Sequence, residues 1–93
     1  MIAVDILERK GLLIECRVGI LNALLKCIEE YQLGINVELM SRDDLREFIR
    51  TFTDAVYNEE EADNMGWERA TIRYCSPMLE KYGLDENDLD KIR

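Results

Sequence analysis

The stretch SRDDLREFIRTFTDAV, residues 41–56, decides the fold class. Ser41 offers a hydroxyl N-cap, and Asp43 and Asp44 put negative charge in the first turn, where the helix dipole favours it. The apolar side chains that follow recur at helical intervals: Leu45, Phe48, Ile49, Phe52 and Val56. Because this spacing places them on one face, we predict an amphipathic helix that begins after Ser41 and ends near Asn58.

Two further apolar patterns precede this helix. The segment from Ile2 to Leu7 has helical spacing and predicts a helix that Gly11 ends, as the left-handed residue after the last turn. From position 12 to position 28 every fourth residue is apolar: Leu12, Cys16, Ile20, Leu24 and Ile28. This second pattern predicts a long helix that ends before Gly34.

The same residues support an alternative with β-structure. Apolar and polar side chains alternate in the second half of residues 2–18, which is typical of a β-hairpin that turns at residues 9–11. In that case the second helix begins only at Gly19. Residues 35–40 also alternate and predict either an extended connection or a short strand.

The last third of the chain continues the helical pattern. A stripe of apolar and aromatic residues runs from Trp67 to Tyr82, where Pro77 requires a kink or a new helix capped by Ser76. Gly83 ends this segment, and Asp85 caps a last short helix. We therefore predict a mainly α fold, one domain over residues 1–93 with four to five helices. The alternative is an α+β fold that contains the hairpin and the strand.

The composition argues against catalysis. The chain has 93 residues, enough for one core, and it contains no His, the most common general base near neutral pH. The cysteines at positions 16, 27 and 75 are odd in number and form no C-x-x-C pair, so we expect buried thiols rather than disulfides or a zinc site. No glycine-rich phosphate loop is present. We predict no enzyme, no cofactor and no metal site.

Negative charge is the strongest functional signal. The formal net charge is −8. Residues 54–93 hold eleven acids against five bases, whereas residues 1–53 hold nine against seven. A concentrated negative field favours docking on a basic surface. The predicted partner-binding residues are Asp54, Glu59, Glu60, Glu61 and Asp63.

Three other patterns have simpler explanations. Arg42, Arg46 and Arg50 form a row of the kind that contacts nucleic acid, but each has an acid three or four positions away, and a chain of this charge repels phosphate. An aromatic row at positions 67, 74 and 82 is more typical of a core than of a contact surface. The acidic run at residues 85–90 lacks the glycine and the distant Glu of a calcium loop.

These observations predict a small acidic protein that binds and inhibits or sequesters a basic partner protein, such as a nucleic-acid enzyme, by presenting carboxylates in place of phosphates. Inhibitors that phages direct against host defence nucleases, and bacteriocin-immunity proteins, share this build, although no motif links the chain to either family. We expect no direct binding of nucleic acid. The alternative function is a structural or regulatory helical module that forms a homodimer or larger homo-oligomer.

The predicted compartment is the cytoplasm. The N-terminal apolar run contains Asp5 and follows no cationic region, unlike a signal peptide. No apolar stretch approaches the roughly 20 residues that a transmembrane helix needs. We therefore expect no contact with a membrane.

Overall fold

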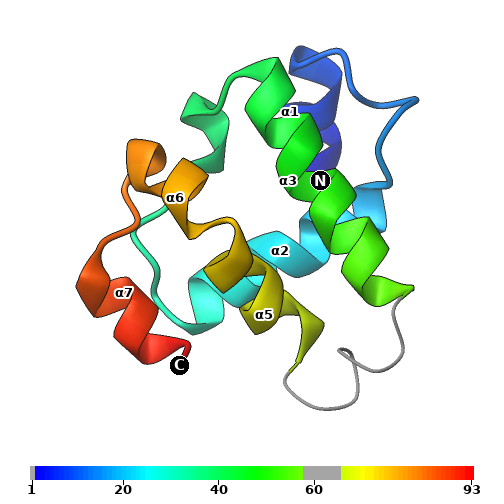
Figure 1. Ribbon diagram of the computed structural model, residues 1–93. Coiled ribbons are helices and arrows are strands. Elements are labelled where there is room, and N and C mark those ends of the chain that lie inside the picture. The colour runs from blue at the N-terminus through cyan, green and yellow to red at the C-terminus, as the bar shows by residue number, and fades with distance from the viewer. Residues whose placement is uncertain (1, 58–65) are drawn as a thin grey trace.

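The computed structural model describes residues 2–57 and 66–93, and all regular elements in these two ranges are helices. They are α1 (Ile2–Arg9), α2 (Val18–Glu30), η1 (Val37–Leu39), α3 (Arg42–Val56), α5 (Trp67–Tyr74), α6 (Ser76–Leu79), η2 (Glu80–Tyr82) and α7 (Glu86–Lys91) (Figure 1). The prediction of a mainly α single domain is confirmed. The alternative with a hairpin at residues 2–18 and a strand at residues 35–40 is wrong, because α1 and the 3₁₀ turn η1 occupy those segments.

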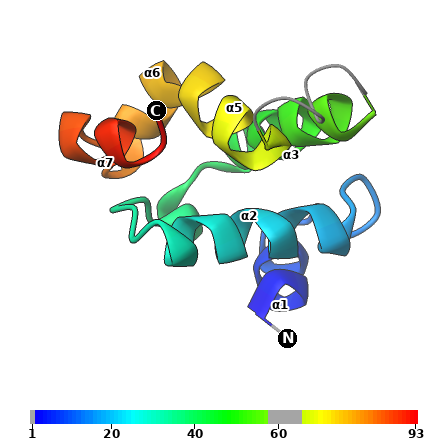
Figure 2. The same cartoon turned by 90° about the horizontal axis from the view of Figure 1, so that it is seen from below.

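Helix α2 crosses the middle of the domain. Figure 2 shows α1 on one side of it and α3, α5, α6 and α7 on the other. The largest fully buried side chains come from both sides: Ile6, Leu7, Leu12, Leu21, Leu24, Met40, Leu45, Phe48, Ile49, Phe52, Ile72 and Leu79. Burying a side chain of this size contributes about 1.5–3 kcal/mol, so this shared core holds the two layers together.

Aromatic packing joins α3 to α5. Phe52 meets Phe48 and Trp67 edge to face, with ring centroids 5.3 Å apart in both pairs. Pairs of this geometry add about 0.5–1.5 kcal/mol beyond the area they bury. Trp67 therefore packs against the core, as the simpler explanation of the aromatic row predicts.

Helix α3 begins as its sequence predicts. The Ser41 hydroxyl accepts a hydrogen bond from the Asp44 backbone N–H at 3.1 Å, so Ser41 is the N-cap. The Tyr82 hydroxyl also accepts from the Ser41 N–H at 3.3 Å and donates to the Asp44 carboxylate. These contacts bring the end of η2 against the start of α3. The helix ends at Val56 with Tyr57 as its C-cap, and Asn58 lies outside the described residues.

The predicted start of α2 at Leu12 is wrong. Gly11 has a φ of +70° and ends α1 as expected, but residues 11–17 then form a turn-rich connection, and α2 begins at Val18. Leu12 and Cys16 are nevertheless buried, and the Cys16 N–H donates to the Leu12 carbonyl at 2.9 Å. The four-residue apolar spacing in this segment therefore reflects a single buried turn rather than a continuous helix.

Pro77 marks a new helix. Helix α5 ends at Tyr74, and α6 begins at Ser76 with Pro77 in its first turn, where the missing N–H leaves no hydrogen bond unmade. The N-cap is Cys75 and not Ser76, and it makes no capping hydrogen bond through its side chain. The prediction of a new start is confirmed and that of its cap is wrong.

The last helix packs back on the domain. Asp85 and Asp88 form a capping box at its start, in which each carboxylate accepts a hydrogen bond from the backbone N–H of the other residue. Ile92 is fully buried and Leu89 packs against the core. The predicted cap at Asp85 is confirmed.

Candidate protein-binding surface

The acidic residues proposed for partner binding belong to the end of α3 and the segment after it. Asp54 is exposed on α3. Glu59, Glu60, Glu61 and Asp63 lie outside the described residues. Between positions 54 and 65 the sequence holds those five acids and no base, so this short segment carries most of the net charge of −8.

The outer face of α3 carries two rows of charged side chains. One consists of Arg42, Arg46 and Arg50, and the other of Asp43, Glu47 and Asp54, with Thr51 between the last two. All these residues except Arg42 line a shallow depression: Asp43, Arg46, Glu47, Arg50, Thr51 and Asp54. The arginine row is therefore not an isolated basic surface.

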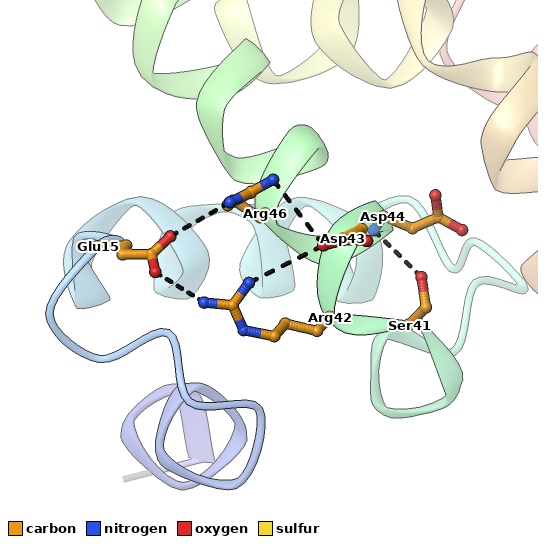
Figure 3. Close-up of polar contacts among 6 residues, drawn as sticks. All are labelled: Glu15, Ser41, Arg42, Asp43, Asp44 and Arg46. Atoms are coloured by element: carbon orange, nitrogen blue, oxygen red, sulfur yellow. Dashed lines mark hydrogen bonds and ion pairs between the residues drawn. The ribbon is translucent and has the colours of Figure 1, made fainter.

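The offsetting acid comes mainly from elsewhere in the chain. Glu15, in the connection after α1, pairs with Arg42 at 2.7 Å and with Arg46 at 3.7 Å (Figure 3). Asp43 lies 3.8 Å from each of the same two arginines. Of the pairs expected from local spacing, Asp43 with Arg46 is confirmed. The pairs of Arg50 with Glu47 and with Asp54, which the same spacing predicts, are not formed among the described residues.

This network ties the exposed connection to α3. We expect Glu15→Gln to lower the free energy of unfolding by about 0.5–1 kcal/mol at low ionic strength, because the Glu15 carboxylate forms ion pairs with the guanidinium groups of both Arg42 and Arg46. The loss should shrink at high salt, since the side chains are 39–44% exposed. Urea unfolding at two salt concentrations measures it.

Glu38→Gln provides the matched control. Glu38 holds a single partner, Arg9, at 2.7 Å, and both side chains are more than half exposed. We expect a loss of only a few tenths of a kcal/mol there. Equal losses in the two variants would show that Glu15 does not act through a shared network.

The three aromatic residues singled out from the sequence separate in the structure. Trp67 and Tyr82 pack against the core, whereas Tyr74 is 78% exposed. Beside Tyr74 lies a groove of about 140 Å³ lined by Glu47, Thr51, Tyr74, Cys75, Pro77 and Met78. This size is close to the roughly 150 Å³ of a cavity that holds one benzene ring.

The cysteines have no chemical role that their surroundings support. All three are free and buried, as expected. Burial raises the pKa of Cys27 and Cys75 to about 11, and it raises that of Cys16 as well. Because the thiolate is the nucleophile and the metal ligand, these thiols are poorly reactive near neutral pH. Within residues 2–57 and 66–93, no three Cys, Asp or Glu side chains are grouped to hold a metal ion.

The acidic run at residues 85–90 has a structural role at Asp88. This carboxylate is 5% exposed and accepts hydrogen bonds from the N–H groups of Gly34 and Asp85 and from the Lys91 ammonium, at 3.0, 3.3 and 3.2 Å. Burial by itself raises the pKa of Asp88, but these donors outweigh it and lower the pKa below its ordinary value. The side chain is committed to joining α7 to the loop after α2, which agrees with the rejection of a calcium loop.

Comparison with known proteins gives no relative: no family model, no curated protein and no solved structure matches the chain. None of the helices in the described ranges combines the length and the apolar character needed to cross a lipid bilayer.

Proposed function

We propose that this chain is a non-enzymatic protein that binds a basic partner, such as a nucleic-acid-binding protein, and inhibits or sequesters it. The binding residues are Asp54, Glu59, Glu60, Glu61 and Asp63. The observation that supports the proposal best is the concentration of five acids and no base in residues 54–65, against 15 acids and 12 bases in the remainder of the chain. A basic surface evolved to hold phosphates attracts such a segment.

The described surface supports a binding role over a catalytic one. The buried thiols are protonated near neutral pH, and the depression on α3 is lined by no cysteine and no serine that could act as a nucleophile. Asp88 is the one carboxylate among the described residues whose pKa is clearly lowered, and it accepts hydrogen bonds from three donors. We assign the protein to the cytoplasm, where reduced thiols such as these persist.

The test removes charge from the acidic segment without changing its size. In a variant carrying Glu59→Gln, Glu60→Gln, Glu61→Gln and Asp63→Asn, we expect affinity for the captured basic partner to fall at least about tenfold at low salt, which is a change of about 1.4 kcal/mol. The partner is first isolated by affinity capture from cell lysate. Its affinity is then measured by calorimetry over a salt series, in which binding to the native chain should weaken as salt rises.

The control variant removes the same number of charges from other exposed acids: Glu29→Gln, Glu30→Gln, Glu80→Gln and Glu86→Gln. None of these four carboxylates forms an ion pair in the described part of the chain. We expect a change of less than about threefold, because only the long-range field is reduced. Equal weakening in both variants, or capture of no basic protein, would contradict the proposal.

A further inference from the structure

The groove beside Tyr74 has the character of a binding pocket for one side chain. Tyr74 is 78% exposed, Pro77 is exposed and Met78 is partly buried against the core. Exposed tyrosine at the edge of a pocket is typical of the residues that dominate protein interfaces. Methionine adapts its shape to whatever apolar group it contacts. The pocket therefore favours an apolar or aromatic side chain.

The charged residues around the groove indicate which kind of partner segment would supply this apolar side chain. Glu47 is the one charged residue among the six that line it. It makes no ion pair within the described residues, and Asp54 lies seven residues further along the same side of α3. At 1.5 Å per residue these two acids are separated by about 10 Å along the helix axis, or two turns. In the neighbouring arginine row, Arg46 is already paired with Glu15 and Asp43, whereas Arg50 lines the same depression as Glu47 and Asp54 and forms no ion pair among the described residues.

We propose that the groove binds a cationic amphipathic helix, which inserts one apolar side chain against Tyr74, Pro77 and Met78 and places cations on Glu47 and Asp54. This inference rests on the proposed function, because the helix is taken to belong to the basic partner. It adds a contact that is apolar and therefore insensitive to salt. Tyr74 is the residue on which that contact depends most.

The test uses a synthetic helical peptide with lysines at two positions seven residues apart and one leucine between them on the same face. We expect the peptide to shift the backbone amide NMR signals of Thr51, Tyr74 and Met78. Replacing its leucine with alanine should weaken binding at least about fivefold, and so should Tyr74→Ala in the protein, as for a central interface residue. Glu47→Gln should weaken binding at low salt only.

Tyr57→Ala is the matched control. Tyr57 is also a largely exposed tyrosine, at 63%, but it does not line the groove. Binding of the peptide should change less than twofold in this variant. The inference is overturned if the two tyrosine variants weaken binding equally, if the shifted signals lie outside the groove, or if the peptide shifts none. It is also overturned if sedimentation shows that the native chain forms a dimer and that Tyr74→Ala makes it monomeric, because a second copy of the chain then covers the groove.

The two proposals fail in different ways. If Tyr74→Ala leaves capture of the basic partner intact while the charge variant at residues 59–63 abolishes it, the proposed function is supported and the groove is excluded as a contact. If the peptide binds as expected but the charge variant has no effect on capture, the groove is supported and the acidic segment is not.

Discussion

Replacing Asp88 with alanine will lower the free energy of unfolding by about 3 kcal/mol or more. The substitution removes a 5%-exposed carboxylate that accepts from Gly34, Asp85 and Lys91. Hydrogen bonds to a charged group contribute about 1.5–3 kcal/mol each, and a buried N–H left without an acceptor adds its own cost. Urea unfolding followed by circular dichroism measures the loss.

Asp90→Ala is the control for this loss. Asp90 lies on the same helix and pairs with Arg93 at 3.1 Å, but both side chains are about two-thirds exposed. We expect it to change stability by less than about 0.5 kcal/mol. A loss of similar size in both variants would mean that Asp88 acts only through the charge of α7.

The Asp88 carboxylate makes the protein less stable as the pH falls. Because its folded-state pKa is lowered, the folded protein favours ionised Asp88 more than the unfolded chain does. This stabilisation is complete above the unfolded-state pKa of about 4 and is lost as the pH falls through the folded-state value. We therefore expect the difference in stability between the native chain and Asp88→Asn to narrow below pH 4. A difference that stays constant from pH 7 to pH 2.5 would contradict this assignment.

Signals that act within one turn of helix could be predicted from the sequence. The side chains of Ser41 and Asp85 each accept a hydrogen bond from a backbone N–H close by in the chain, and Gly83 adopts a positive φ. For these three residues the residue type alone identifies the helix cap or the helix end. The mainly α fold followed from these signals and from the apolar spacing of α3. The acidic segment could be predicted only as a concentration of charge, because four of its five proposed residues lie outside the described part of the structure.

Contacts between distant segments could not be predicted in this way. Glu15 pairs with Arg42 and Arg46, which lie 27 and 31 positions further along the chain. Asp88 accepts a hydrogen bond from the backbone N–H of Gly34, 54 positions away. Nothing in the local sequence distinguishes these acids from their exposed neighbours. Only the folded chain brings them to their partners.

Helix α5 shows how two apolar stripes can compete on one segment. The stripe through Trp67 and Tyr74 predicts both as core residues, and Trp67 does pack against the core. Tyr74 is exposed, because the segment from α5 to α6 buries Ile72, Cys75 and Leu79 instead. Those three residues also have helical spacing and are more uniformly aliphatic. Burial of this stripe turns Tyr74 outward, which is why the groove was not foreseen from the sequence.

Of the five possible Gly→Ala substitutions, Gly83→Ala will destabilise this protein most. Gly83 has a φ of +110°, and a Cβ atom there would lie 2.1 Å from the Gly34 carbonyl oxygen and 3.2 Å from its carbon. These are backbone atoms, so no side chain can rotate away to relieve the overlap. Strain of this kind costs about 1–3 kcal/mol for the conformation alone, and overpacking adds a similar amount. We expect a total loss of at least about 3 kcal/mol, a more than hundredfold fall in the folding constant.

Gly19→Ala tests whether this loss comes from the backbone contact. Gly19 lies in the first turn of α2, and a Cβ there would meet no atom within 4 Å. The same substitution should therefore stabilise the protein by about 0.4–1 kcal/mol, through the entropy of the unfolded chain. Thermal unfolding of both variants gives the comparison, and a Gly83→Ala variant as stable as the native chain would contradict the assignment.

Because Gly83 follows directly on η2 and α6, its approach to Gly34 also fixes the segment that carries Pro77 and Met78. Gly83→Ala should therefore broaden or shift the NMR signals of the residues that line the groove, whereas Gly19→Ala should leave these signals in place.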